Sequence, residues 1–146
     1  KVTIIGKDAF HSCWNLELTK IPESVKNIES GAFHYCRKVT SLKIPKEVTE
    51  IKSWTFARTG LTTIELHESI TKLGYRAFFD CSSLSSLKIP SSVTYIDELV
   101  FKGCSKLTTI NYNSTKADWN NITKPLNWNQ DSNITTIVCT DGTITL

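Results

Sequence analysis

Residues 70–92 read ITKLGYRAFFDCSSLSSLKIPSS, and most of the chain repeats this pattern. Aligned on V-x-x-I-x-x-x-A-F-x-x-C-x-x-L-x-x-L-x-I-P, the sequence contains five copies at a period of 23 residues. The copies cover residues 2–24, 25–47, 48–69, 70–92 and 93–114. A fixed period of this length is typical of a solenoid, in which each copy contacts only its neighbours. The sequence therefore predicts a single repeat domain over residues 1–114, an architecture that excludes most enzyme folds.

The apolar positions of the pattern recur in every copy and predict the hydrophobic core. The aromatic column consists of Phe10, Phe33, Phe56, Phe78 and Phe101. Burying one such side chain contributes about 1.5–3 kcal/mol. No single copy could bury its apolar positions alone, so the copies are expected to stack.

Each copy is expected to contain two short strands joined by turns. Residues 84–90 read as one strand, because Leu87 and Ile89 alternate with the outward Lys88. Proline ends this strand, because it has no backbone N–H to donate to the hydrogen bonds between strands. The V-x-x-I stretch predicts a second, weaker strand on the opposite wall, and A-F-x-x-C predicts a tight or short helical turn. Equivalent strands of successive copies are expected to pair in parallel.

Residues 115–146 depart from the repeat and predict a C-terminal cap. A short helix is expected over about residues 115–122, starting at Ser114 or Thr115 with Asp118 as a capping-box partner weaker than glutamate. Two strands are expected at 134–140 and 143–146, because Asp141-Gly142 between them is a strong hairpin signal.

The chain begins at Lys1 inside a repeat, without a polar cap and without methionine or a visible signal peptide. A solenoid end of this kind exposes an apolar stacking face. We therefore expect the sequence to be an excised or processed piece of a longer protein, so the missing targeting segment says nothing about the compartment.

The repeat resembles the BspA-like leucine-rich repeat family, whose copies read L-x-x-L-x-I-P-x-x-V-x-x-I-G-x-x-A-F-x-x-C. Gly6 and Gly74 keep the family's glycine, and the other three copies replace it. The tail stretches TKADWNNI and CTDGTI also resemble the family's C-terminal end. The resemblance implies a right-handed coil of leucine-rich repeats with short parallel β-strands, few short helical turns and a helix-plus-hairpin cap.

Four of the five cysteines occupy one repeat position, where copy three has Thr59 instead. They are Cys13, Cys36, Cys81 and Cys104. No closely paired ligands of the C-x2-C type suggest a metal site. The favoured interpretation is a ladder of buried free thiols. A disulfide between neighbouring coils, Cys13–Cys36 or Cys81–Cys104, is an alternative that distance permits.

The sequence contains no catalytic constellation, so we predict a non-enzyme without cofactor or metal. G-x-S-x-G, H-E-x-x-H and phosphate-binding loops are absent, and the carboxylates are scattered. His11 and His34 share a repeat position, but no third ligand follows them, which favours surface histidines. The net charge of +3 is too small and dispersed to indicate nucleic acid as a partner. The apolar runs are too short for membrane insertion.

Two sets of outward positions could bind a partner. The outward column of the longer strands is Lys20, Lys43, Glu65, Lys88 and Asn111. One interpretation is that these side chains only keep the sheet solvated and protect its edge. The other is that they form a weakly cationic, hydroxyl-rich face that binds an acidic protein or a glycan. The second set, at positions that are polar in other copies, is Trp14, Tyr35, Trp54 and Phe79. These aromatics could form an interface or simply pack along the turns.

The leading hypothesis is a non-catalytic interaction module of a cell-surface or secreted protein. The repeat predicts a rigid protein-binding scaffold. The surface location, and possible adhesion to host or matrix proteins such as fibronectin and fibrinogen, are implied by the family resemblance. The alternatives are a structural spacer that presents another domain, and a glycan-binding module that uses Trp14 or Trp54 as a stacking platform.

Overall fold

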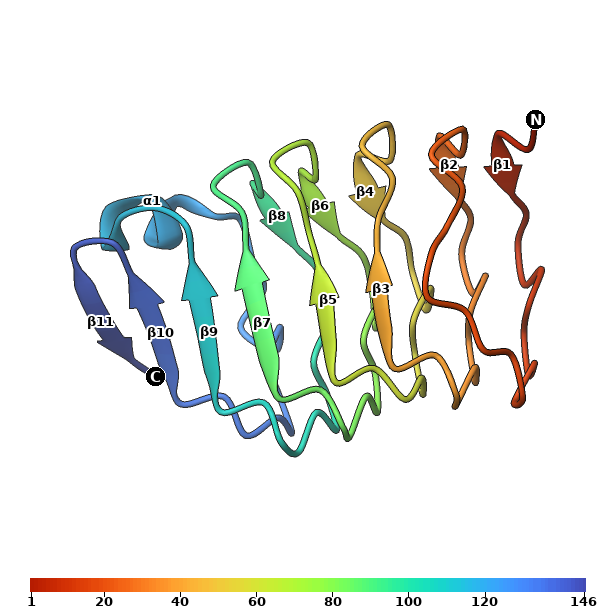
Figure 1. Cartoon of the computed structure of the whole chain (residues 1–146). Helices are drawn as coiled ribbons and strands as arrows, with labels where there is room; N and C mark the ends of the chain where they lie inside the picture. Colours follow the sequence, from red (N-terminus) through yellow and green to blue (C-terminus); the bar gives the residue numbers. More distant parts are fainter.

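The computed structural model describes residues 1–146 as a stack of coils, with the two termini at opposite ends of the stack (Figure 1). Each copy of the repeat forms one coil, and equivalent strands of successive coils lie side by side. The predicted repeat solenoid with short parallel strands is confirmed. Its stacking follows from the repeat, because every coil presents the same apolar columns to its neighbours.

One wall is a six-stranded sheet in the order β11-β10-β9-β7-β5-β3. Its strands are β3 (Ser41–Lys43), β5 (Thr63–Glu65), β7 (Ser86–Ile89), β9 (Thr109–Tyr112), β10 (Thr136–Cys139) and β11 (Gly142–Thr145). All neighbours pair in parallel except β11, which closes the sheet as an antiparallel hairpin with β10. A parallel bridge between Lys20 and Lys43 carries the pairing back to the first coil.

The opposite wall consists of two-residue strands, so the predicted weaker strand is confirmed. A three-stranded parallel sheet contains β4 (Glu50–Ile51), β6 (Lys72–Leu73) and β8 (Tyr95–Ile96). The first two coils pair separately through β1 (Ile4–Ile5) and β2 (Asn27–Ile28). In each of these strands the second residue, an isoleucine or leucine, is buried and the first is not.

The A-F-x-x-C segments form turns that hydrogen-bond to the next coil, as Phe56 N does to Ala77 O at 3.0 Å. Two positions in each turn have positive φ. The first is occupied by Asp8, Gly31, Trp54, Arg76 and Leu99, and the second by Ser12, Tyr35, Arg58, Asp80 and Gly103. Only two of these residues are glycine, so most turns hold a side chain in a conformation that costs about 1–2 kcal/mol for an L-residue.

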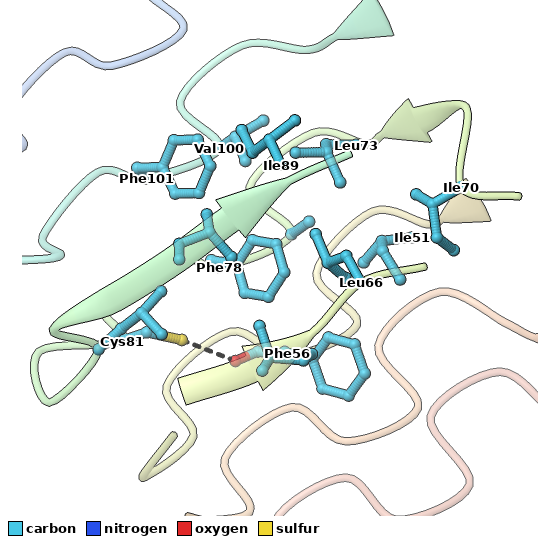
Figure 2. Packing of buried hydrophobic residues seen from close by; sticks show 14 of the residues in the cluster. Ile51, Phe56, Leu66, Ile70, Leu73, Phe78, Cys81, Ile89, Val100 and Phe101 are labelled. Atoms are coloured by element: carbon cyan, nitrogen blue, oxygen red, sulfur yellow. Dashed lines mark hydrogen bonds between the residues drawn. The ribbon is translucent and has the colours of Figure 1, made fainter. Parts of the chain in front are cut away.

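The phenylalanine column forms a stacked spine through the core. Successive rings from Phe10 to Phe101 lie nearly parallel, with centroids 5.4, 5.6, 5.9 and 5.8 Å apart. Figure 2 shows Phe56, Phe78 and Phe101 among the aliphatic side chains of the same coils. Trp128 meets the last ring edge-on at 6.0 Å, so the C-terminal segment continues the spine with a different residue.

The cysteines are free thiols, and all except Cys13 are buried. Three thiols donate to the carbonyl oxygen of a phenylalanine on the preceding coil: Cys36 to Phe10 at 3.1 Å, Cys81 to Phe56 at 3.0 Å (Figure 2) and Cys104 to Phe78 at 3.1 Å. Burial raises the pKa of Cys36 and of Cys81 to about 11. The buried thiols therefore stay protonated and act as packing groups.

The cap contains the predicted helix and hairpin. Helix α1 (Lys116–Asn121) begins at Thr115, which forms a capping box with Asp118. Trp119 on this helix is buried against Tyr112 and Trp128, with ring centroids 5.3 and 5.7 Å apart. The aromatic cluster covers the last coil, which otherwise would expose its apolar columns.

Candidate interaction surface

Turn positions of copies two to four bring aromatic and arginine side chains together on one ridge of the stack. We define the aromatic–arginine ridge as His34, Tyr35, Trp54, Arg58, Tyr75, Arg76 and Phe79, all of them half-buried. They come from repeat positions that do not contribute to the core columns. The ridge is therefore a feature of these three copies and not of the repeat in general.

The rings of the ridge form a continuous chain from coil two to coil four. His34 lies with its ring centroid 4.8 Å from that of Tyr35 and 5.5 Å from that of Trp54. Trp54 in turn lies 5.4 Å from Phe79 and 5.8 Å from Tyr75. Aromatic pairs at such distances attract beyond the area that they bury, so neighbouring coils hold one another's side chains in place.

Two arginines lie over these rings. The guanidinium carbon of Arg58 is 4.8 Å from the Tyr35 centroid and 5.4 Å from that of Phe79. That of Arg76 is 4.9 Å from Trp54 and 5.0 Å from Phe79. Cation–π contacts of this kind fix the guanidinium groups while leaving most of their N–H donors unused.

Several ridge residues occupy unfavourable local conformations. Tyr35, Trp54, Arg58 and Arg76 have φ of 65°, 61°, 57° and 53°. Glycine would adopt these turns without steric cost. Backbone outliers with large side chains gather at functional sites, where the surroundings hold them in place.

Two nitrogens of the ridge are buried without a hydrogen-bond partner, His34 Nε2 and Arg76 Nε. Such groups are rare in folded proteins, and each costs about 1–3 kcal/mol. The ridge thus combines strained turns and unpaired polar atoms in one place. The positive-φ turns recur in every coil, whereas the unpaired nitrogens are not required by the stacking of the coils.

His34 is the titrating group of the ridge. Burial lowers its pKa below the ordinary value of 6.5, and the nearby charges of His11 and Arg58 lower it further, against a smaller opposite effect of Asp8. The neutral imidazole is therefore favoured in the folded state, where it lies among aromatic rings.

This lowered pKa predicts an acid-sensitive stability. Above pH 6.5 the histidine is neutral in both states, so its contribution is fully present. As the pH falls below 6.5, the unfolded chain binds a proton that the folded chain resists, and the free energy of unfolding decreases. Urea denaturation at a series of pH values from about 7.5 to about 5 measures this decrease. His34→Gln is expected to show a shallower dependence, and an identical slope would contradict the assignment.

The structure brings three of the four sequence-predicted aromatics together. Tyr35, Trp54 and Phe79 lie on the ridge, whereas Trp14 is 60% exposed on the first coil and pairs with no other ring. Sequence reasoning missed Arg58 and Arg76, although both stand at the turn positions of these aromatics. Reading the turn positions across copies two to four would have found them.

The outward strand column is exposed along its whole length, as predicted. Lys43 and Glu65 form an ion pair at 3.8 Å, which neutralises the middle of the column. Exposed pairs of this kind contribute little to stability. Lys20 and Lys88 make no ion pair, so the column keeps a weak positive charge at two separate points.

The two histidines predicted to lie one coil apart do so, since the ring centroids of His11 and His34 are 4.8 Å apart. No group of three or more His, Cys, Asp or Glu side chains is placed to bind a metal ion. None of the helices has the length and apolarity needed to cross a lipid bilayer.

Comparison with known families identifies the repeat. The family model for the BspA type leucine rich repeat region matches residues 3–123, in six copies. The chain belongs to the BspA-type leucine-rich repeat family. Leucine-rich repeats of this type are generally non-enzymatic scaffolds that bind proteins. None of the curated proteins matches the chain.

Solved structures of bacterial leucine-rich repeat proteins are similar to this chain. A leucine-rich cell surface protein from Faecalibacterium prausnitzii is 35% identical with a TM-score of 0.79, and the match covers 84% of this chain and 32% of that protein. The leucine-rich repeat protein of T. pallidum is 29% identical with a TM-score of 0.72, over 75% of this chain and 52% of that one. A leucine-rich repeat protein from Bacteroides ovatus is 26% identical with a TM-score of 0.62, and the match covers 77% of this chain and 37% of that protein. The chain thus spans between a third and a half of these proteins' lengths.

Proposed function

We propose that this BspA-type repeat region is a protein-binding module of a bacterial cell-surface protein and that it binds its partner through the aromatic–arginine ridge. The observation that carries the proposal is the continuous chain of rings and guanidinium groups over three coils. Tryptophan, tyrosine and arginine dominate the residues that contribute most to protein–protein binding. The cell-surface location is supported by the Faecalibacterium protein, which is described as a cell surface protein.

A protein partner fits the ridge better than a glycan. Sugar binding by stacking needs a tryptophan with an open ring face. Trp54 is bracketed along the ridge by His34 at 5.5 Å and by the Arg76 guanidinium at 4.9 Å. The glycan alternative therefore depends on Trp14, which is exposed and unpaired but stands alone.

A binding role also accounts better than a spacer role for the local cost of the ridge. A spacer needs only the stacked columns, and every coil passes through the same two positive-φ positions, which copy five fills with Leu99 and Gly103. Copies two to four place aromatic and cationic side chains at these turns, and two of their nitrogens, His34 Nε2 and Arg76 Nε, are buried without a hydrogen-bond partner. Unpaired buried nitrogens reduce local stability, and a purely structural coil gains nothing from them.

Adhesion to a host or matrix protein is the specific form of this function that we propose. Immobilised fibronectin and fibrinogen serve as probes, with the wild-type chain and Trp54→Ala compared by surface binding. Tryptophan and alanine share the same steric cost at positive φ, so the substitution isolates the loss of the ring. We expect binding to weaken by about 30-fold or more, as for a residue at the centre of an interface.

Two further variants serve as controls for this experiment. Leu126→Ala changes a fully exposed cap residue and is expected to leave binding unchanged. Lys43→Gln with Lys88→Gln alters the strand column without touching the ridge. If this double variant abolishes binding and Trp54→Ala retains it, the ridge is not the binding surface. If the wild-type chain binds neither probe, adhesion to these two matrix proteins is excluded.

A further inference from the structure

Copy three is one residue shorter than its neighbours in the turn that leads into the main sheet. Thr59-Gly60-Leu61 stands where copy four has residues 81–84. In the other four copies, the N–H of the residue equivalent to Leu61 donates to a carbonyl three residues earlier, at 3.0–3.2 Å. Leu61 makes no such bond. The missing residue therefore changes the surface of the stack at this one coil.

The shortened turn lies unusually close to coil two and leaves a hollow beside it. A Cβ at Gly60 would fall 2.0 Å from the carbonyl oxygen of Arg37, so only glycine fits there. The hollow has a volume of about 510 Å³ and is lined by residues of coils two to five. Its polar walls include Arg37, Arg58, Asp80, Ser82 and Ser83, and we call it the copy-three hollow.

Two guanidinium groups meet at this hollow around one ring. The guanidinium carbons of Arg58 and Arg37 are 4.8 and 5.8 Å from the Tyr35 centroid. Arg37 is exposed and forms no ion pair. Arg58 uses only Nε, which donates to Asp80 Oδ2 at 3.1 Å, so its two terminal nitrogens keep their donors free. The walls carry two positive charges against one carboxylate that is already engaged.

We propose that the copy-three hollow binds a carboxylate side chain of the partner protein, an inference that rests on the proposed function of the ridge. A guanidinium presents paired N–H donors in the plane that a carboxylate accepts, and such charged hydrogen bonds are about twice as strong as neutral ones. The hydroxyls of Ser82 and Ser83 supply two more donors at the wall. Tyr35 and Arg58 belong to both the ridge and the hollow, so one partner segment can contact both.

The local charge favours an acidic peptide segment over a sulfated glycan. Highly sulfated chains bind through extended runs of cations, and beyond Arg37 and Arg58 the hollow offers none. The net charge of the whole chain is only +3. A peptide segment with one or two carboxylates matches the two guanidinium groups of the hollow.

A direct test uses the full chain and a fluorescent peptide of alternating glycine, serine and glutamate, with the glutamine version as the neutral probe. Fluorescence anisotropy is expected to show salt-sensitive binding of the acidic peptide and none of the neutral one. Arg37→Gln removes an exposed side chain outside the core and is expected to weaken acidic-peptide binding by roughly tenfold. Lys106→Gln, an exposed cation in the corresponding loop of copy five, is the matched control and is expected to change nothing.

Equal losses in Arg37→Gln and Lys106→Gln would show general charge attraction and overturn the proposal, as would tight binding of heparin with none of the peptide. The result is separable from that of the ridge. If Arg37→Gln weakens acidic-peptide binding while Trp54→Ala leaves matrix-protein binding intact, the carboxylate-site proposal is supported and the ridge proposal fails. If Trp54→Ala abolishes matrix-protein binding while Arg37→Gln leaves acidic-peptide binding unchanged, the ridge proposal is supported and the carboxylate-site proposal fails.

Discussion

Phe56→Ala is expected to lower the free energy of unfolding by about 3–5 kcal/mol. Phe56 is completely buried in the third coil, with Phe33 stacked on one side at 5.6 Å and Phe78 on the other at 5.9 Å. Removing the ring leaves a cavity in the middle of the spine and weakens both coil–coil contacts at once. Because each coil contacts only its neighbours, no distant contact compensates.

Urea denaturation followed by circular dichroism measures this loss, which is large against the roughly 5–15 kcal/mol of a typical domain. The matched control is Phe10→Ala, in the same column on the first coil, where the ring is only partly buried and stacks on Phe33 alone. We expect a clearly smaller cost there. Equal costs at the two positions would show that two-sided stacking does not determine the stability of the spine.

Gly60→Ala is expected to destabilise the protein by about 1–3 kcal/mol, although alanine usually stabilises a chain relative to glycine. The cause is contact and not backbone conformation, since the new Cβ would lie 2.0 Å from the Arg37 carbonyl oxygen and 3.1 Å from its carbon. Both atoms belong to the backbone of coil two, so relief requires the coils to move apart. That movement would also widen the copy-three hollow.

Gly6→Ala is the control for this experiment, because a Cβ at Gly6 meets no atom within 4 Å. Its stability is expected to stay unchanged or to rise slightly, as the unfolded chain loses conformational freedom. Thermal and urea denaturation of the two variants gives the comparison. If Gly60→Ala proves as stable as Gly6→Ala, the close approach of coils two and three does not constrain residue 60.

The regular parts of the fold could be predicted because the same residue pattern occurs in five copies. The phenylalanine column predicted the spine, and the alternation at Leu87, Lys88 and Ile89 predicted β7 with its buried and exposed faces. Ser114 or Thr115 followed by Asp118 marked the start of the only helix, and the structure places the cap at Thr115. In each case the residues that signal the structure recur at the repeat period or lie within one turn of the chain. These elements could therefore be predicted without knowing which residues of different columns contact one another.

The ridge and the hollow could be predicted only in part. Tyr35, Trp54 and Phe79 were found as aromatics outside the core, but Trp14 was grouped with them and Arg58 was not. These residues occupy different repeat positions, and their meeting depends on how the positive-φ turns direct each side chain. The copy-three deletion was visible in the sequence, whereas the resulting hollow was not.

The sequence by itself determined that this protein is a stack of coils with a phenylalanine spine and a capped C-terminal end, whereas only the structure decided that the cysteines are free thiols. A 23-residue period leaves no other way to bury the same apolar columns in every copy. The tertiary structure alone decided which outward residues meet, because contacts such as Arg58 on Tyr35 and Arg76 on Trp54 join neighbouring coils at unlike positions. Periodicity fixes contacts within a column, while contacts between columns depend on the turn geometry and on one missing residue.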